Sequence, residues 1–141
     1  MISLSVKSIM AKSVVSFKKG DNLDDITSTM AKRQISCVII VENKKPIGLI
    51  TERDILKLCA IKKNLSKLKA RDVMSKKVIS VQEDETIFKA ATLMEKNKIR
   101  RLPVVNGGVM VGLITETDVV KSMTSVAKYL NEKLIEYITN T

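Results

Sequence analysis

The chain contains no histidine and no tryptophan, and aromatic residues account for 3% of its 141 residues. Histidine is the side chain that most often serves as a general base, and no nucleophilic side chain here has an evident base near it in the sequence. Glycine-rich phosphate loops of the Walker or dinucleotide type are also absent. These absences argue against an enzyme, and we predict no catalytic residue.

Cysteine is equally scarce. Cys37 and Cys59 form no Cys-x-x-Cys pair, and no third thiol or imidazole completes a zinc site. We therefore expect two reduced thiols and no metal. Residues 1–9 do not resemble a signal peptide, and no apolar run approaches the roughly 20 residues needed to cross a bilayer. The expected location is the cytoplasm, away from membranes.

Aliphatic side chains replace the missing aromatic ones. Hydrophobic residues make up 45% of the chain, mainly Ile, Val, Leu and Met, which is typical of a globular protein rather than a disordered one. A body of this size buries roughly 68 to 70% of its unfolded surface, whereas two independent small domains would be marginal. We therefore expect one domain-sized body.

A sequence repeat organises the chain. The segment Gly48–Asp54 (GLITERD) returns 64 residues later as Gly112–Asp118 (GLITETD). The same shift, without a gap, aligns these identical pairs: Met10 and Met74, Val14 and Val78, Ser16 and Ser80, Met30 and Met94, Ile35 and Ile99, Val41 and Val105. A repeat of this kind cannot bury its apolar face alone, so we expect the two copies to pack on each other.

Each copy is predicted to form strand, helix, strand, strand and helix. The apolar periodicity predicts strands at 14–17, 37–41, 47–50, 78–81, 102–105 and 109–114. It predicts helices from a cap at 21 or 22 to about 33, at 52–61, at about 86–97 and from 116 onward. The strands at 37–41 and 47–50 are expected to pair as a hairpin.

The pattern divides the chain into repeat 1 at residues 1–64, repeat 2 at 65–124 and a C-terminal amphipathic helix at 125–141. This last segment has no counterpart in repeat 1. Apolar residues occupy every fourth position in it: Val126, Leu130, Leu134 and Ile138. The helix either packs on its own module or lies in a dimer interface.

The repeated Thr-x-x-Asp has two interpretations. It can be a capping box, although that motif usually ends in Glu or Gln, which reach further than Asp. Alternatively, the helix N-terminus attracts a phosphate while the carboxylate accepts hydrogen bonds from the vicinal hydroxyls of a ribose. Gly48 or Gly112 would then let something approach the strand closely. The second interpretation favours a nucleotide as ligand.

These motifs resemble those of the tandem cystathionine-beta-synthase (CBS) domain, or Bateman module. The resemblance rests on the paired GLITExD motifs, the Leu102–Val105 strand, and the segments Ile9–Met10 and Val73–Met74, and it spans about residues 6–123. It implies a mixed α/β (α+β) fold of two βαββα repeats, packed through their sheets with pseudo-two-fold symmetry. It also implies a flat homodimer and two clefts that bind AMP, ADP, ATP, S-adenosylmethionine or methylthioadenosine.

The resemblance further implies that each cleft is shared between the repeats. Cleft 1 would be lined by Thr51, Arg53, Asp54, Met74, Val78, Ile79, Ile99 and Arg100. Cleft 2 would be lined by Thr115, Thr117, Asp118, Met10, Val14, Val15, Ile35 and Ser36. By this resemblance the aspartates bind ribose, the first threonine of each motif binds phosphate or ribose, and the aliphatic residues surround adenine.

The two clefts differ in charge. Arg53 and Arg100 of cleft 1 correspond to Thr117 and Ser36 of cleft 2, so we expect cleft 1 to prefer a phosphorylated ligand. The segment Cys37–Val41 also lacks the Leu-Pro found in the second repeat, which leaves the adenine pocket of cleft 2 less well defined. No cofactor is required in this interpretation, because the adenosine compound is a regulatory ligand acting on a separate protein.

Two other functions are open. The net charge of +10 and the basic segment 62–77 suggest a nucleic-acid binder, although few aromatic residues are present for stacking and no helix-turn-helix is evident. A protein-interaction module that ignores nucleotides is the third hypothesis. Only the sensor hypothesis predicts that adenosine ligands raise the thermal stability.

Overall fold

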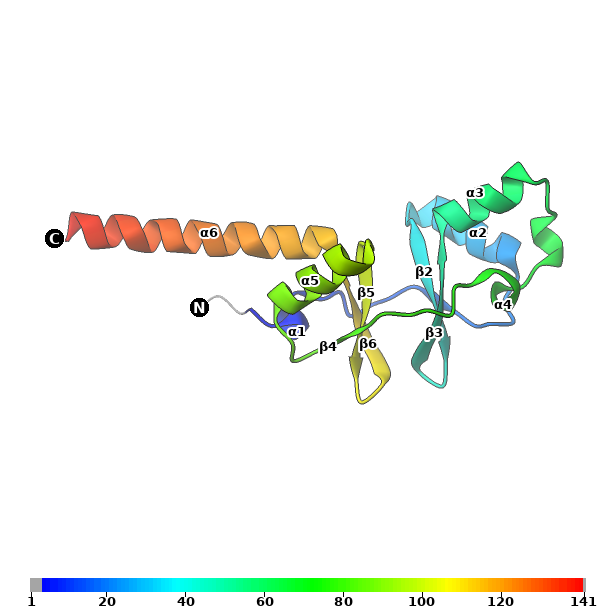
Figure 1. Cartoon of the computed structure of the whole chain (residues 1–141), viewed down its shortest axis with the longest axis horizontal. Coiled ribbons are helices and arrows are strands. Elements are labelled where there is room, and N and C mark those ends of the chain that lie inside the picture. The colour runs from blue at the N-terminus through cyan, green and yellow to red at the C-terminus, as the bar shows by residue number, and fades with distance from the viewer. Residues whose placement is uncertain (1–3, 141) are drawn as a thin grey trace. The chain divides into compact units, whose positions relative to one another are not determined.

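The computed structural model describes residues 4–140, which form two compact units. Unit 1 comprises the chain up to Lys12, Ser80–Asn106 and the chain from Val111 onward. Unit 2 comprises Ser13–Ile79 and Gly107–Met110. Residues 1–3 and 141, at the outer ends of the predicted repeat 1 and C-terminal helix, lie outside the described residues. Figure 1 shows the elements of both units.

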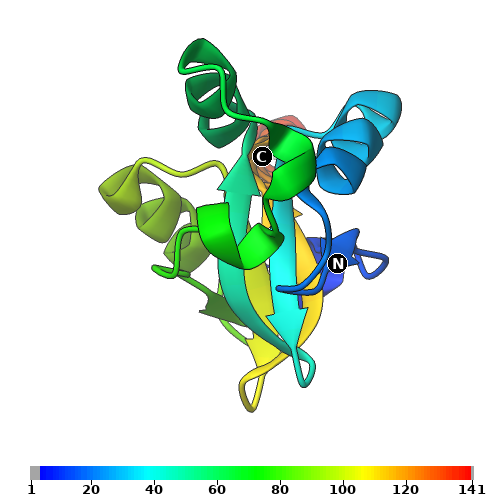
Figure 2. The ribbon, with the colours of Figure 1, turned by 90° about the vertical axis from the view of Figure 1, so that its right-hand side faces the viewer.

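Unit 2 contains a three-stranded sheet in the order β1-β2-β3. Its strands are β1 (Ser16–Phe17), β2 (Cys37–Glu42) and β3 (Lys45–Thr51), and its helices are α2 (Leu23–Arg33), α3 (Glu52–Ala60), the 3-10 helix η1 (Leu65–Lys67) and α4 (Ala70–Val73). β1 runs parallel to β2, and β2 pairs with β3 as the predicted antiparallel hairpin. Figure 2 shows α2 and α3 flanking this hairpin.

The core of unit 2 lies between α2 and the β2–β3 hairpin. Leu23, Ile26 and Met30 recur at helical spacing along α2 and are buried. They meet Val38 and Ile40 of β2, with Ile50, Ile55 and Ala70 completing the cluster. The continuous apolar run of β2 is therefore explained by a strand that is covered on both faces.

Unit 1 repeats this plan and adds a long helix. Its sheet has the order β4-β5-β6, built from β4 (Val81–Gln82), β5 (Arg101–Asn106) and β6 (Val109–Thr115). The first two residues of β6, Val109 and Met110, are grouped with unit 2. Its helices are α1 (Val6–Ile9), α5 (Ile87–Asn97) and α6 (Glu116–Thr139). Ile87, Ala90 and Met94 of α5 are buried, as are Leu102 and Val104 of β5 and Ile114 of β6.

The segments that precede β1 and β4 are exchanged between the repeats. Ala11, which precedes the first repeat's sheet, pairs with Leu113 on β6 in unit 1 through two backbone hydrogen bonds of 2.9 Å. Ser75 pairs in the same way with Leu49 on β3 in unit 2. Each compact unit therefore joins one repeat's helices and sheet to the entry segment of the other repeat.

The predicted βαββα repeats and mixed α/β fold are confirmed. The strands predicted at 14–17 and 78–81 are too long, because β1 and β4 pair with their parallel neighbours over only two residues each. The short helices α1, η1 and α4 were not predicted. The division at 1–64, 65–124 and 125–141 stays a prediction, although α6 runs through residue 125 without a break.

The described residues 4–140 hold no helix with both the length and the apolar character needed to cross a membrane. Within the same range, no group of three or more Cys, Asp or Glu side chains is placed to hold a metal ion.

Candidate functional site

Thr51 and Asp54 close a capping box at the start of α3. Asp54 Oδ2 accepts hydrogen bonds from the Thr51 backbone N–H at 2.9 Å and from Thr51 Oγ1 at 3.0 Å. Thr51 Oγ1 accepts in turn from the Asp54 N–H at 3.3 Å. Thr51 retains an extended backbone (φ −112°, ψ 163°) where β3 ends. The cap thus fixes both half-buried side chains at the junction of strand and helix.

Thr115 and Asp118 form the same arrangement at the start of α6. The three corresponding distances are 2.9, 2.9 and 3.2 Å, and the Thr115 backbone has φ −112° and ψ 162°. The capping-box interpretation of Thr-x-x-Asp is therefore confirmed in both copies, in spite of the short aspartate. The two motifs are nearly superimposable in their internal geometry.

Each cap uses one oxygen of its carboxylate. The bonds from the threonine end on Oδ2 of Asp54 and of Asp118, which leaves Oδ1 outside the cap. An ionised carboxylate can accept about four hydrogen bonds. The cap therefore holds the side chain in one orientation and leaves acceptor capacity for a hydroxyl group.

The amides of each helix N-terminus are partly occupied. The Glu52 N–H donates to the Ser36 carbonyl at 2.9 Å, and the Glu116 N–H donates to the Arg100 carbonyl at 2.9 Å. Together with the cap, this engages two of the first three amides of α3 and of α6. Fewer donors remain for a phosphate than a bare helix N-terminus would offer, so the carboxylate is the stronger candidate for ligand contact.

Each predicted cleft draws its residues from both units. Of the cleft 1 set, Thr51, Arg53, Asp54, Met74, Val78 and Ile79 lie in unit 2, and Ile99 and Arg100 lie in unit 1. Of the cleft 2 set, Met10, Thr115, Thr117 and Asp118 lie in unit 1, and Val14, Val15, Ile35 and Ser36 lie in unit 2. The aliphatic members of both sets are half-buried. Their grouping around shared clefts stays a prediction.

Within one unit, the structure brings Ser36 to the Thr51 motif and Arg100 to the Thr115 motif, through the backbone bonds given above. Arg100 also lies near Glu116, with Nε 3.5 Å from Oε2. The two side chains are 88% and 59% exposed, so this ion pair is weak. Arg53 is exposed on the first turn of α3. Arg53 and Arg100, the two residues expected to contact a phosphate, therefore both have accessible, positively charged side chains.

Gly48 and Gly112 make room for a methionine. A Cβ atom built on Gly48 would lie 2.8 Å from Met74 Cγ, and one on Gly112 would lie 2.6 Å from Met10 Sδ and 2.7 Å from the Ala11 carbonyl oxygen. Both methionines are half-buried. The close approach expected at these glycines is therefore made by the exchanged entry segments of the chain itself.

Two grooves occupy equivalent positions in the repeats. One of about 500 Å³ lies between α5 and α6 in unit 1, and one of about 300 Å³ lies between α2 and α3 in unit 2. Neither is lined by Asp54 or Asp118. The sequence analysis missed these grooves, although the adjacent apolar pair Ile55 and Leu56 signals one: side chains 100° apart on a helix cannot both face one narrow core.

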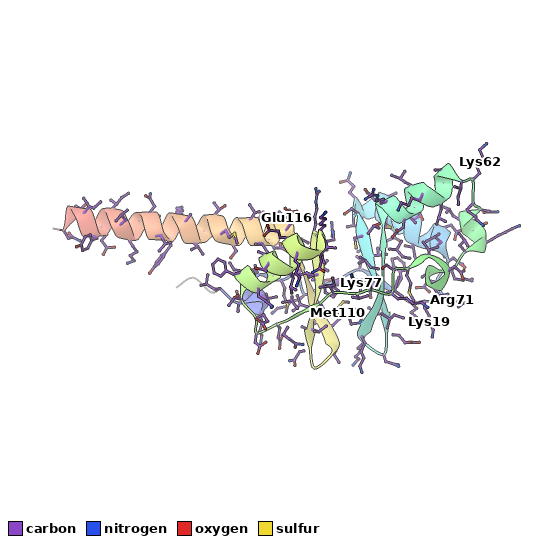
Figure 3. All side chains as sticks on the ribbon, in the orientation of Figure 1. Lys19, Lys62, Arg71, Lys77, Met110 and Glu116 are labelled. Carbon is purple, nitrogen blue, oxygen red and sulfur yellow. The ribbon has the colours of Figure 1, made fainter. Side chains whose placement is uncertain are left out.

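The basic segment 62–77 does not form one compact patch. Figure 3 shows Lys62 at the outer end of α3 and Lys77 well away from it within unit 2. Arg71 shares a hollow with Lys19, but Glu42 and Asp72 line the same hollow, and Lys19 Nζ lies 2.7 Å from Glu42 Oε1. Acidic neighbours thus interrupt the positive surface that a nucleic-acid backbone would require.

The fold and the paired motifs define a module built from two tandem repeats, and sequence comparison identifies its family. The pattern of the CBS domain matches the chain twice, at residues 6–61 and 70–125. The matches cover well over half of the chain, which therefore belongs to the CBS domain family as a tandem pair.

Individual relatives agree with this membership. An uncharacterized protein of Methanopyrus kandleri is 37% identical over 124 residues, which cover 86% of this chain and 63% of that protein, so the chain spans less than two thirds of this relative. The CBS domain pair of protein MJ0100, in complex with 5′-methylthioadenosine and S-adenosyl-L-methionine, is 28% identical, with a TM-score of 0.76 and coverage of 89% of this chain and 98% of that one.

A third relative is an assembly. The hexameric CBS-CP12 protein from bloom-forming cyanobacteria is 25% identical, with a TM-score of 0.73 and coverage of 85% of this chain and 71% of that one. Relatives of this chain therefore include a binder of adenosyl ligands and an oligomer.

Proposed function

We propose that this CBS pair is a non-catalytic regulatory module that binds an adenosine-containing ligand and transmits its occupancy to a separate protein. The observation that carries the proposal is the orientation of Asp54 and Asp118. In each, the cap holds Oδ2 and leaves Oδ1 available beside a strand-to-helix junction. A fixed carboxylate acceptor suits the paired hydroxyls of a ribose, because no side-chain entropy remains to be lost on binding.

The proposed roles differ among the site residues. Asp54 and Asp118 bind the ribose, and the half-buried aliphatic side chains named for each cleft surround the adenine. Thr51 and Thr115 act mainly by holding the carboxylate, since their hydroxyl groups are committed to the cap. A phosphate, where the ligand has one, would meet Arg53 or Arg100.

The ligand class follows from this chemistry and from a relative. The CBS domain pair of MJ0100 is 28% identical and was solved with 5′-methylthioadenosine and S-adenosyl-L-methionine. Methylthioadenosine carries no phosphate, which suits a site whose helix amides are partly occupied. We therefore place methylthioadenosine and S-adenosylmethionine ahead of AMP, ADP and ATP as ligands of cleft 2, and AMP-type ligands in cleft 1.

A ligand that contacts both repeats favours one arrangement of them over others, and this preference is the proposed route to the regulated protein. The proposal includes a homodimer, as the family resemblance implies, and a cytoplasmic setting. The regulated protein is separate from the residues described.

Calorimetric titration of the purified chain tests the proposal. We expect methylthioadenosine and S-adenosylmethionine to bind saturably, and Asp118→Asn to weaken the binding at least tenfold while keeping an acceptor oxygen for the cap. Glu116→Gln serves as the matched control and should bind normally. Glu116 is an exposed residue in the same first turn of α6, two positions before Asp118. Titrations without heat or saturation for any adenosine compound would contradict the proposed function.

A further inference from the structure

A hollow of about 460 Å³ lies beside α4 in unit 2, and we call it the α4 hollow. Its lining combines three cations, two carboxylates and two apolar side chains: Lys19, Arg71, Lys76, Glu42, Asp72, Ile47 and Met74. All seven residues belong to unit 2, and only Met74 is also named in a predicted cleft. The volume lies within the range of sites that bind small molecules.

The walls of the α4 hollow are set by the fold. The Arg71 backbone N–H donates to the Lys19 carbonyl at 2.9 Å, which fixes α4 to the loop that follows β1. On the other side, Met74 packs over Gly48 of β3. Figure 3 shows Lys19 and Arg71 at this end of unit 2. The charged side chains are exposed, but the segments that carry them are held together by these contacts.

Both carboxylates of the α4 hollow are engaged. Glu42 Oε1 lies 2.7 Å from Lys19 Nζ, and Asp72 Oδ2 accepts a backbone hydrogen bond of 2.8 Å in the cap of α4. By contrast, Arg71 and Lys76 form no ion pair within residues 4–140. The acidic groups interrupt the extended surface that a nucleic acid needs, but a single small anion needs only these two cations.

The equivalent place in unit 1 has the opposite charge. The loop Lys18–Asp21 (KKGD), with two lysines and one aspartate, aligns with Gln82–Glu85 (QEDE), which carries three carboxylates. Glu83 stands where Lys19 does, and its Oε1 accepts a hydrogen bond of 2.6 Å from the uncharged Asn106 side chain. A carboxylate held in this way would repel an anion, so the difference between the repeats favours anion binding in unit 2.

We propose that the α4 hollow is a binding site for a small phosphomonoester that carries an apolar group. The phosphate meets Arg71 and Lys76, because a guanidinium presents paired N–H donors that match two phosphate oxygens and an ammonium adds a point charge. The apolar group lies against Ile47 and Met74, which are half-buried in the same hollow. The net charge of +10 attracts such anions to the chain.

This site is separate from the carboxylates of the proposed adenosine sites. Ile47 precedes Thr51 by four residues along the extended strand β3, which corresponds to roughly 13 Å. Asp54 lies beyond Thr51, in the first turn of α3. The inference therefore goes beyond the proposed function, and it stands whether or not an adenosine compound binds.

Titration of the full chain with phenyl phosphate, followed by heteronuclear NMR spectroscopy, tests the site. We expect saturable shifts centred on the amides around the α4 hollow, and binding about tenfold tighter than that of inorganic phosphate, because the ring covers the apolar wall. Arg71→Gln should weaken the binding about tenfold and Lys76→Gln about threefold, through the loss of charge-assisted hydrogen bonds. Both side chains are exposed, so both variants should fold normally.

The repeat supplies the matched controls. Lys7 and Lys12 occupy the positions of Arg71 and Lys76 in the entry segment of repeat 1. Lys7→Gln and Lys12→Gln lower the net charge by one, as the test variants do, and should leave the affinity for phenyl phosphate unchanged. Saturating adenosine, which has no phosphate, should not displace phenyl phosphate.

Four results would overturn the proposal. They are the absence of saturable binding, unchanged affinity in both Arg71→Gln and Lys76→Gln, equal weakening in the test and control variants, and displacement of phenyl phosphate by adenosine. Equal weakening would show that only the net charge matters, and displacement would place the anion in an adenosine site.

Discussion

Met74 packs directly over Gly48, and Met10 bears the same relationship to Gly112 in the other unit. Each methionine comes from the entry segment of one repeat and lies on the sheet of the other repeat. The glycines are thus explained by close packing within each unit. The contact makes each sheet depend on a segment that lies far from it in the sequence.

Substitution of these glycines by alanine should therefore destabilise the protein. Gly112→Ala should cost about 1–3 kcal/mol of unfolding free energy, because the new Cβ would meet the Ala11 carbonyl oxygen, a backbone atom that cannot easily move. Gly48→Ala should cost less, because the three atoms nearest to its new Cβ all belong to the side chain of Met74, which can move more easily than a backbone carbonyl. Urea denaturation would measure both values.

Gly20→Ala is the control for this pair, since the nearest atom to its new Cβ is the tip of Arg71 at 3.7 Å. It should change the stability by no more than about 0.5 kcal/mol. If Gly112→Ala were as stable as Gly20→Ala, the proposed packing of the Met10–Ala11 segment on β6 would be wrong.

The capping boxes predict a second stability effect. Asp54→Ala removes the acceptor for two hydrogen bonds from Thr51 and should lower the unfolding free energy by about 1–2 kcal/mol. Asp118→Ala should lower it by a similar amount, because its cap has the same geometry.

Glu52→Ala provides the comparison. Glu52 also lies in the first turn of α3 and interacts favourably with the helix dipole, but its side chain takes no part in the cap. It should cost less than 1 kcal/mol, as measured by the same denaturation experiment. Equal losses for Glu52→Ala and Asp54→Ala would show that the carboxylate acts only through its charge.

The repeat and its hydrophobic periodicity predicted the order strand, helix, strand, strand, helix in both copies, and the resemblance to the CBS domain supplied the mixed α/β fold class. The hydrophobic periodicity located α2, α5 and the hairpin strands to within one or two residues at most ends. Because these elements bury a complete apolar stripe, the periodicity of apolar residues in the sequence is sufficient to predict them.

The features that were missed depend on tertiary contacts. α1 and α4 have only four residues each, too short for a periodic signal, and they are held by contacts with distant segments such as Val6 with Glu85. The capping interpretation of Thr-x-x-Asp was recognised, but only the structure separates the carboxylate oxygen within the cap from the one outside it. The assembly of the clefts stays a prediction.

The charge difference between the predicted clefts leads to a third prediction. Arg53→Thr gives the first motif the sequence of the second, and it should reduce the preference for AMP over adenosine by about tenfold in cleft 1. Competition binding with the two ligands would measure the ratio. Thr117→Ser, at the matching position of the second motif, should leave this ratio unchanged. An unaltered ratio in Arg53→Thr would remove Arg53 from the phosphate site.

Thermal melting with added ligand tests the central claim most directly. The native chain should gain roughly 2.7 kcal/mol of stability at a ligand concentration about 100 times the dissociation constant, because the ligand binds only the folded state. The ligands to compare are methylthioadenosine, S-adenosylmethionine and AMP. For a given ligand, the shift in melting temperature should vanish in one of the two variants Asp54→Ala and Asp118→Ala, which identifies the cleft that binds it. Each shift is measured against the same variant without ligand. The shift should persist in Glu52→Ala. The absence of a shift with all three ligands would contradict the account of this CBS pair as an adenosine-ligand sensor.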